Sequence, residues 1–528
     1  MRGVLVLLPA ALFTKCVGLF YKIPLLHIVG VSGMAYFLAA YHVYSLLFLL
    51  SSTGLPTALS LQIARAVARG ERRAVRRIFL LALWVFLGIG LCGSACLLFF
   101  APQLAARLAM RDAAAAIMAI APALALSAFL GAAKGYFQGH QQMGATALSE
   151  VLEAAGKLVF GLCLALYAKG KGYTAPVVAA YAIFGITVGM ALAALVLCVW
   201  LLLHAALRHG GEKGAPLQTR RAVLSELLRV ALPITLSAAV IGLVSLVDTA
   251  LISGRLQAAG LGADAAHRIY SSYGNLAVPL YNLVPSLLSP VTLALMPLLG
   301  AAMAGGDREG VTLALHTARR VALFVAVPAA LGLAVFSAPV LSLIYQGQEE
   351  AVRIAAPTLR LLALSVLPSA LMTLMGAVLQ ATGHTLLPVV ATGVGAAVKL
   401  VSEWVLLCVP RVYILGAPIS TLLCTLTVLF IELFALSRYL RLRVLPLGDI
   451  LRPFVAALPA VALGVFCYRL LCLHAGDSPF LLLPVLPLVL VCYLALALPA
   501  GALTKRELLA LPFGERLCPL LEKTKLLK

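Results

Sequence analysis

Long apolar stretches alternate with short polar segments along the whole chain. Clear examples are residues 78–100, 114–138, 175–205 and 480–500. A helix needs about 20 apolar residues to cross the hydrocarbon core of a bilayer, so this pattern predicts about 14 membrane-spanning helices. A helix also satisfies its own backbone hydrogen bonds, which a segment inside a bilayer must do. The pattern therefore predicts an all-α polytopic membrane protein.

The most polar interior break, residues 206–229, divides the predicted helices into two groups. We expect two pseudo-symmetric six-helix lobes followed by two additional C-terminal helices. The predicted parts are an N-terminal lobe at 1–205, a cytoplasmic linker at 206–229, a second lobe at 230–445, two additional helices at 446–502 and a basic cytoplasmic tail at 503–528.

Matching polar positions support a duplication. Lys157 follows Gln138 by 19 residues, and Lys399 follows Gln380 by the same 19. The offset between the two lysines is 399 − 157 = 242 residues. A six-helix unit starts and ends on the same side of the membrane, so the two copies would be parallel repeats related by an axis along the membrane normal. Two such bundles can rock about a central site, which is the geometry of alternating access.

Composition strengthens the membrane interpretation. The chain has 528 residues, of which 63% are hydrophobic and 11% charged, whereas a soluble domain is about 45–50% apolar and about 25% charged. The net charge of +21 would suggest nucleic acid in a soluble protein. Here the basic residues crowd alternate loops, which the positive-inside rule explains through topology and contact with membrane lipid. That rule predicts that both termini lie in the cytoplasm.

Other sequence features exclude several function classes. The 11 cysteines are scattered through apolar helices without metal-ligand spacing, so we predict no metal site and no cofactor. No nucleotide-binding GxxxxGK[ST] motif occurs, which argues against ATP-driven pumping. The nine histidines are dispersed, and nothing in the sequence resembles an enzyme. Nucleic acid is not an expected partner. The N-terminal apolar run continues past Lys15 without a cleavage site and reads as the first spanning helix.

Five lysines lie within hydrophobic stretches: Lys15, Lys22, Lys134, Lys157 and Lys399. An ionisable residue at the centre of a spanning helix costs about 2.5–3.5 kcal/mol on insertion scales, so such residues usually serve a function. The lysines outnumber the acids near them, and the excess positive charge would attract an anionic substrate. A phosphate group suits a lysine, which acts as a point charge.

The predicted site has three groups of residues. The expected substrate-binding residues are Lys15, Tyr21, Lys22, Lys134, Gln138, Lys157, Asn275, Asn282 and Lys399. The expected ion-coupling or gating residues are Glu153, Asp248, Arg255 and Glu403. The expected hinge residues are Gly54, Pro56, Pro285 and Pro297.

Structural interpretations stay open for several of these residues. Glu153–Lys157 and Lys399–Glu403 could be closed ion pairs that only fasten helices. Lys15 could extend toward an interface, Asp248 could pair with Arg255, and the prolines could mark ordinary kinks. Since each duplicated lysine has a glutamate one turn away, the less paired Lys15, Lys22 and Lys134 are the better candidates for substrate contact.

Several runs resemble the stage V sporulation protein B family. They are residues 18–25 (GLFYKIPL), 54–60 (GLPTALS), 134–139 (KGYFQG), 232–236 (LPITL), 248–249 (DT), 255–260 (RLQAAG) and 328–333 (PAALGL). That family belongs to the multidrug/oligosaccharidyl-lipid/polysaccharide exporter superfamily. The resemblance implies a MATE-like fold and the transfer of undecaprenyl-pyrophosphate-linked saccharides between leaflets, with the peptidoglycan precursor lipid II as the expected cargo. It also implies a multi-pass protein of the bacterial cytoplasmic membrane with a role in cell-wall or spore-cortex synthesis, and with cell-wall synthesis proteins as partners.

Lipid II flippases of that superfamily carry essential basic residues in helices 1, 2 and 8. The first corresponds to Lys15. The second has no clear match, because Arg65 lies too near the cytoplasmic end of its helix, and the third is missing from residues 273–276 (YGNL). These departures leave the cargo open.

Two other hypotheses remain beside the flippase. A cation-coupled multidrug exporter of the same fold would need membrane carboxylates in the N-terminal lobe, where helix 1 offers lysines instead. A non-transporting membrane scaffold of a cell-wall synthesis complex would have little reason to keep unpaired polar groups in the membrane.

Overall fold

The computed structural model describes residues 2–52, 54–206, 219–288, 308–384, 386–409, 412–440 and 447–503, together with Leu299. The secondary structure of these ranges is helical, with no strand among them, which confirms the all-α prediction. Eleven of the described helices are long and apolar enough to cross a membrane. The chain is therefore a multi-pass membrane protein, and the total of about 14 spans stays a prediction.

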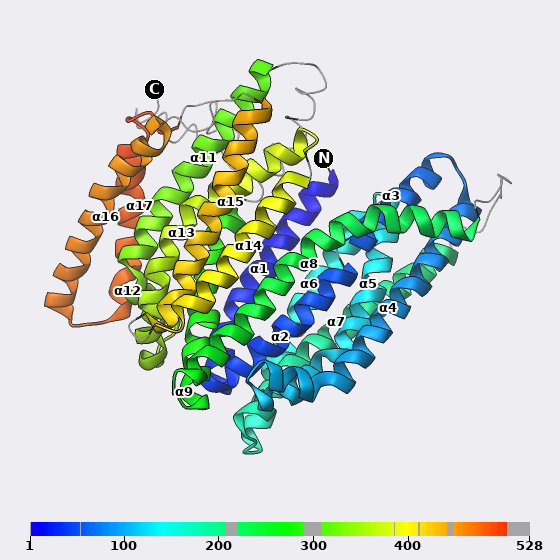
Figure 1. The fold of residues 1–528 in the computed structure, drawn as a ribbon, viewed down its shortest axis with the longest axis horizontal. Coiled ribbons are helices and arrows are strands. Elements are labelled where there is room, and N and C mark those ends of the chain that lie inside the picture. Colours follow the sequence, from blue (N-terminus) through cyan, green and yellow to red (C-terminus); the bar gives the residue numbers. More distant parts are fainter. Residues whose placement is uncertain are drawn as a thin grey trace. The chain divides into compact units, whose positions relative to one another are not determined.

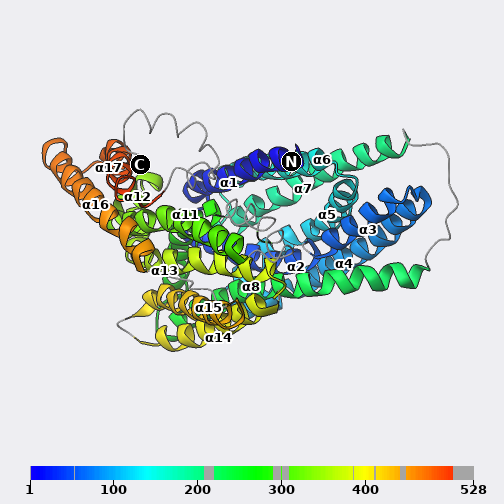
Figure 2. The ribbon, with the colours of Figure 1, turned by 90° about the horizontal axis from the view of Figure 1, so that it is seen from above.

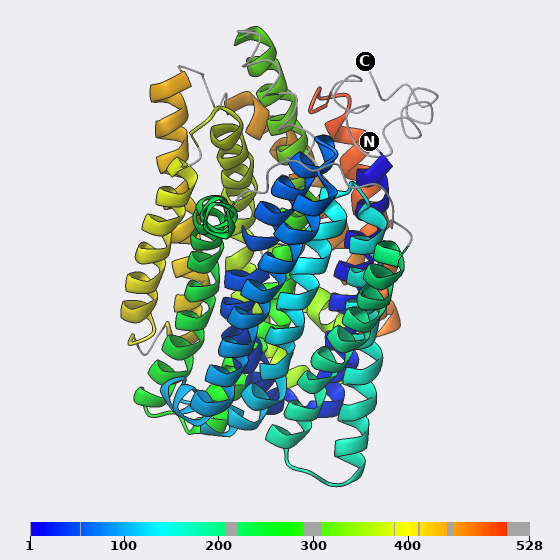
Figure 3. The same cartoon turned by 90° about the vertical axis from the view of Figure 1, so that its right-hand side faces the viewer.

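The described part of the chain forms two compact units, residues 1–271 and 272–528. The first unit contains α1 (Arg2–Val29), α2 (Val31–Ser52), α3 (Gly54–Ala68), α4 (Arg72–Arg107), η1 (Arg111–Ala113), α5 (Ala114–Gly139), α6 (Met143–Gly170), α7 (Ala175–Ala206), α8 (Arg220–Ala258) and α9 (Ala263–Ser271). Its helices α6 and α7 pack along each other and are joined by a short turn (Figure 3). Helix α1 lies beside α6, and α5 packs against α4 and α7 (Figures 1 and 2).

The second unit begins with the π-helix η2 (Ser272–Ala277), and helical backbone continues through residue 288. It also contains α11 (Arg308–Val335), α12 (Ser337–Ile344), α13 (Glu349–Ala381), α14 (Leu386–Leu406), η3 (Tyr413–Leu415), α15 (Gly416–Leu440), α16 (Leu447–Ala475), η4 (Pro479–Leu481) and α17 (Leu482–Ala497). Helix α13 packs against α11 and α15, α14 packs against α15, and α16 packs against both α17 and α11.

The boundary between the compact units differs from the predicted lobe boundary. Helix α8 packs against α2 and α3, so α8 and α9 belong to the first unit although the predicted second lobe begins at residue 230. The division into compact units follows from contacts between helices, whereas the predicted lobe boundary concerns the sequence repeat. The six-plus-six lobe division therefore stays a prediction.

Large apolar side chains remain exposed along the spanning helices. Trp84 is 73% exposed, Phe99 77% and Phe430 71%. A soluble protein rarely leaves so many large apolar groups exposed, whereas hydrocarbon tails accommodate them. Inside the first unit, glycine and alanine take the place of large side chains, because close packing of helices in a membrane depends on small residues.

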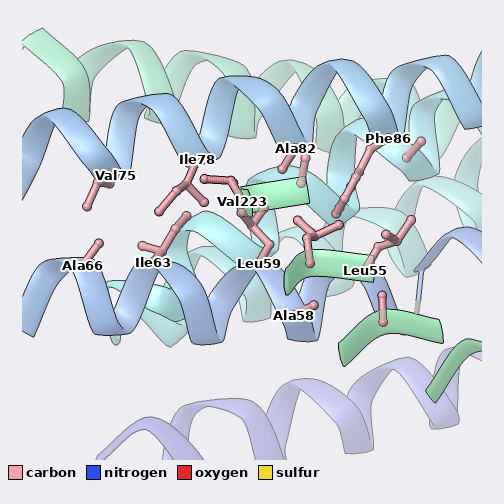
Figure 4. Packing of buried hydrophobic residues seen from close by; sticks show 14 residues of the cluster. Leu55, Ala58, Leu59, Ile63, Ala66, Val75, Ile78, Ala82, Phe86 and Val223 are labelled. Carbon is pink, nitrogen blue, oxygen red and sulfur yellow. The ribbon is translucent and has the colours of Figure 1, made fainter. Parts of the chain in front are cut away.

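A cluster of buried apolar residues joins α3, α4 and α8 in the first unit (Figure 4). Leu59 and Ile63 of α3 face Ile78 of α4, and Val223 of α8 lies between them. Gly54 begins α3, and a Cβ there would lie 2.3 Å from the Ala231 carbonyl oxygen of α8. Gly54 therefore allows α3 and α8 to approach closely.

The predicted hinge role of the glycine and the prolines stays a prediction. Pro56 is buried in α3, and Pro285 lies half-buried in the helix that follows η2. Pro297 falls outside the described residues.

A buried ion pair joins α11 to α16 in the second unit. The Arg319 side chain is 2% exposed and donates to Asp449 Oδ2, with Nε at 3.0 Å and a second contact from the Nη2 group. His316 Nε2 lies 3.6 Å from the same carboxylate. The next residue, Arg320, donates to the Gly501 carbonyl oxygen, and Arg452 donates to the same oxygen at 3.3 Å. Helix α16 is thus tied to α11 by an ion pair as well as by packing, and a hydrogen bond ties α11 to Gly501 after α17.

We expect Asp449→Asn to lower the free energy of unfolding of the protein by about 3–5 kcal/mol, the range for removing one partner of a buried ion pair. The substitution keeps the size of the side chain and removes the charge that balances Arg319. Thermal unfolding in detergent measures the change. Asp477→Asn, in the exposed turn after α16, is the control and should leave the midpoint unchanged. Equal midpoints for the two variants would contradict the assignment.

Candidate functional site

A cluster of charged and aromatic side chains lies in the first unit around Lys157. Lys157 is at the middle of the span Met143–Gly170, 14 residues after its start and 13 before its end. Its Nζ atom lies over two aromatic rings, 5.1 Å from the centroid of Tyr21 on α1 and 5.4 Å from that of Tyr41 on α2. Such contacts stabilise a desolvated cation by about 2 kcal/mol. The rings thus partly replace the water that the lysine would have outside the membrane.

Tyr21 is held firmly in this arrangement. Its side chain is fully buried, and its hydroxyl donates to the Ala182 carbonyl oxygen of α7 at 3.2 Å. The ring also packs against Phe37 of α2 at a centroid distance of 6.2 Å. Tyr41 is exposed at 36%. The aromatic environment of Lys157 is therefore buried on the Tyr21 side and exposed on the Tyr41 side.

Four glycines bring α6 and α7 into backbone contact beside Lys157. A Cβ on Gly156 would lie 2.4 Å from Gly189 Cα, and a Cβ on Gly185 would lie 2.3 Å from Gly161 Cα. A Cβ on Gly189 would also lie 2.8 Å from the Lys157 backbone nitrogen. We call these four residues the glycine seam. The seam fixes the stretch of α6 that carries the site.

Lys134 on α5 forms an ion pair with Glu153 on α6. The distance from Lys134 Nζ to Glu153 Oε1 is 2.8 Å, and both side chains are 19% exposed. The prediction that Lys134 is one of the less paired lysines is therefore wrong. The Glu153 carboxylate pairs with Lys134 rather than with Lys157. This is because α5 and α6 face each other there and the Lys157 side chain points toward the aromatic rings.

Lys22 adds a second positive charge near Lys157, and the two charges repel each other. Neither Lys22 nor Lys157 forms an ion pair with a carboxylate in the described part of the chain. Glu150 is half-buried near Lys134 and Glu153. The backbone of Lys15 lies in α1, while its side chain falls outside the described residues. The described charges of this cluster are three lysines and two glutamates, a net positive balance.

Gln138 lies at the end of α5, one turn after Lys134. Its Nε2 group donates to Thr146 Oγ1 of α6 at 3.4 Å. This contact closes the turn between α5 and α6, and the amide oxygen of Gln138 is left to accept other bonds.

The matching lysine of the second unit has a different environment. Lys399 is 7% exposed and lies 3.5 Å from Glu403 Oε2, one turn further along α14. Glu403 is fully buried, and Glu432 on α15 is 3% exposed. The Lys399–Glu403 ion pair is therefore present. Both residues lie on α14, so the pair itself joins no second helix, and its role as a fastener stays a prediction. The two lysines at the same repeat position thus have different partners.

The remaining predicted residues are spread more widely. Asn275 is buried in η2, where its carbonyl oxygen accepts from the Tyr345 hydroxyl at 3.2 Å, whereas Asn282 is exposed. Asp248 and Arg255 both lie half-buried on α8 of the first unit. Their pairing with each other and their gating role stay predictions.

Sequence reasoning missed a polar network on α2. His42 Nδ1 lies 2.7 Å from Thr249 Oγ1 of α8, and Thr249 Oγ1 lies 2.9 Å from the Tyr270 hydroxyl of α9. The signal was the run Tyr41-His42 inside an otherwise apolar helix. The same signal would have pointed to Tyr41 as a neighbour of a membrane lysine.

The cluster around Lys157 can bind an anion but offers no catalytic arrangement. In the described ranges, no group of three or more histidine, cysteine, aspartate or glutamate side chains could hold a metal ion. Two lysines without ion pairs, beside a third that is paired, favour a ligand whose negative charge is spread over several oxygen atoms.

Comparison with protein families gives two matches. The family described as "Polysaccharide biosynthesis protein" matches residues 1–303, and the family described as "MatE" matches residues 233–405. Together they span residues 1–405, which include the whole first unit and the first part of the second.

Individual proteins also align with this chain, at low sequence identity. Stage V sporulation protein B of Bacillus subtilis (strain 168) is 25% identical over 325 residues, which cover 61% of this chain and 62% of that protein, less than two thirds of its length. Lipid II flippase MurJ of the same organism is 24% identical over 416 residues, covering 76% of each chain. A solved structure of lipid II flippase MurJ in an inward closed conformation has a TM-score of 0.67 at 16% identity, covering 93% of this chain and 97% of that one. The last likeness establishes the shared fold.

Proposed function

The chain belongs to the polysaccharide biosynthesis protein family, within the multidrug/oligosaccharidyl-lipid/polysaccharide exporter superfamily, and from that premise we propose that it is a flippase for a lipid-linked saccharide. Its family and its structural neighbours are transporters and flippases, not enzymes. The proposed cargo is an undecaprenyl-pyrophosphate-linked saccharide, with the peptidoglycan precursor lipid II first among the candidates. The proposed process is cell-wall or spore-cortex synthesis, with lipid-linked glycan and cell-wall synthesis proteins as partners.

The observation that carries the proposal is the net positive cluster at the middle of α6. Lys157 and Lys22 are half-buried within spanning helices and without ion pairs in the described part of the chain. Keeping such cations in a bilayer is costly unless an anion offsets the cost during part of the cycle. A pyrophosphate group supplies that charge while the polyprenyl tail stays in lipid. In this proposal Lys15, Lys22, Lys134, Lys157 and Gln138 contact the headgroup.

The proposed cycle is alternating access. The pyrophosphate headgroup binds from the cytoplasmic side, and a change of conformation then opens the site to the outside. Glu153, Asp248, Arg255 and Glu403 are proposed to take part in ion coupling or gating, and Gly54, Pro56, Pro285 and Pro297 to act as hinges. The repeat offset of the two lysines supports this two-lobed mechanism.

A cation-coupled drug exporter is the second candidate, and the MatE match over residues 233–405 is the observation that favours it. The charge of the described cluster argues against it, because a cationic drug would meet Lys22 and Lys157. A non-transporting scaffold remains the third candidate.

Reconstitution in liposomes separates the three candidates. We expect the pure protein to move a labelled undecaprenyl-pyrophosphate disaccharide between leaflets faster than protein-free liposomes do. The matched substrates are the same sugar on undecaprenyl monophosphate, which has one phosphate fewer, and the cationic dye ethidium. Transport of ethidium without the lipid-linked sugar would support the exporter. No movement of any of the three would support the scaffold.

A further inference from the structure

A pocket at one end of the first unit is formed by α3, α4 and α8. Its polar lining consists of Gln62, Arg65, Arg69, Glu71, Arg77 and Glu226. The pocket lies apart from the Lys157 cluster in the sequence, and none of its lining residues is assigned to the proposed transport site or its hinges. Its possible ligand is therefore a separate question from the cargo.

The floor and rim of the pocket are held in place by packing. Ala66, Ile78 and Val223 line the pocket and also belong to the buried apolar cluster of α3, α4 and α8 (Figure 4). The rim is the turn that ends α3, where Gly70 has a φ of 74° and the Glu71 nitrogen donates to the Ala66 carbonyl oxygen at 3.0 Å. A left-handed glycine with this bond closes a helix C-terminus in a defined geometry. The shape is thus set before any ligand binds.

The pocket carries uncompensated positive charge. Arg65 pairs with Glu226 at 2.7 Å, which leaves Arg69, Arg77 and Glu71 as the other charges of the lining. Within the described ranges, no carboxylate forms an ion pair with Arg69 or Arg77. Two guanidinium groups in one concavity suit the oxygens of a phosphate group.

Gln62 adds a hydrogen-bond acceptor to this lining. Its side chain is 6% exposed, and its Nε2 group donates to the Val223 carbonyl oxygen at 3.2 Å. Its Oε1 atom is buried and accepts no hydrogen bond. A buried acceptor without a hydrogen bond destabilises the folded protein, so a ligand with a donor next to its phosphate would recover this loss.

The position of the pocket relative to the membrane indicates the source of such a ligand. Arg69 and Glu71 lie between the spans Val31–Ala68 and Arg72–Arg107, at the level where lipid headgroups lie. We propose that the pocket binds the headgroup of phosphatidylglycerol, with its phosphate on Arg69 and Arg77 and a glycerol hydroxyl donating to Gln62 Oε1. The positive-inside rule accounts for arginines in this loop. It does not account for a buried acceptor without a hydrogen-bond partner on a residue that lines a concave site.

Thermal unfolding of the detergent-purified protein tests the proposal with a lipid panel. We expect phosphatidylglycerol to raise the midpoint more than phosphatidylmethanol does, which has the same charge and no hydroxyl, and more than phosphatidylcholine does. A ligand that binds only the folded state raises stability as its concentration exceeds Kd. Arg69→Gln and Arg77→Gln should each reduce the phosphatidylglycerol shift by at least half. Arg76→Gln, an exposed arginine of the same helix outside the pocket, is the control and should keep the full shift.

Gln62→Met tests the acceptor separately. We expect this variant to respond equally to phosphatidylglycerol and phosphatidylmethanol, because the hydroxyl has lost its partner. Arg69 is exposed, so Arg69→Gln folds and keeps the test decisive even if Gln62→Met does not. A full shift in Arg69→Gln and Arg77→Gln would overturn the proposal. An equal shift with soluble glycerol 1-phosphate would also overturn it, since the site would then bind a free anion rather than a lipid.

Discussion

Replacing Lys157 by glutamine is expected to slow translocation of the lipid-linked headgroup by about 10- to 100-fold. The variant loses a charge-assisted contact with the pyrophosphate, worth about 1.5–3 kcal/mol, and every 1.4 kcal/mol is a factor of ten. Tyr21 and Tyr41 would keep their positions, because Tyr21 is anchored to Ala182 independently of the lysine. The measurement is the initial rate of headgroup movement in liposomes.

The chain contains a matched control for this substitution. Lys171 lies just after α6, and its Nζ atom is 5.8 Å from the Tyr167 ring centroid, a similar cation–π contact on an exposed residue. Lys171→Gln should transport at the wild-type rate, and Lys157→Arg should recover most of the loss. Removing a buried cation should leave thermal stability unchanged or raised. A wild-type rate for Lys157→Gln would show that the cluster does not touch the headgroup.

Replacing Gly189 by leucine is expected to prevent stable folding of the first unit. The leucine Cβ alone would lie 2.8 Å from the Lys157 backbone nitrogen and 3.0 Å from the Gly156 carbonyl carbon. Overpacking costs about 1–3 kcal/mol when side chains can move. Here the atoms in the way are backbone, so α6 and α7 must separate and the cost is larger. Yield of monodisperse protein and the thermal midpoint in detergent measure the effect.

Gly144→Leu is the matched control for the seam. Gly144 is on the same helix α6 and exposed, and a Cβ there would meet nothing within 4 Å. This variant should fold with an unchanged midpoint. If Gly189→Leu matched it, α6 and α7 would not be in backbone contact in solution.

The helices and the membrane lysines could be predicted from the sequence because apolar length and composition decide both. The partners of the lysines could not. Glu153 is one turn from Lys157 along α6 and 19 residues from Lys134, yet it pairs with Lys134. Which face of α6 turns to α5 depends on helix rotation, which the glycine seam determines. The spacing Gly185-x-x-x-Gly189 was visible in the sequence, but its partners on α6 required the packed helices.

The duplicated lysines show the same limit. An equal spacing from Gln138 and Gln380 marks Lys157 and Lys399 as copies, and only the structure separates their roles. Lys399 forms an ion pair with the glutamate one turn away on α14. Lys157 instead places its Nζ atom over two aromatic rings. One copy is neutralised, and the other stays available to a ligand.

The pair Arg319–Asp449 has a consequence for how the family can vary. A relative without a counterpart of α16 lacks the acid, and its α11 would then bury a guanidinium without a counter-charge. Leaving one member of such a pair buried costs about 3–5 kcal/mol. Relatives that lack α16 should therefore carry an uncharged side chain at the position of Arg319. An alignment sorted by helix number would show these two positions changing together.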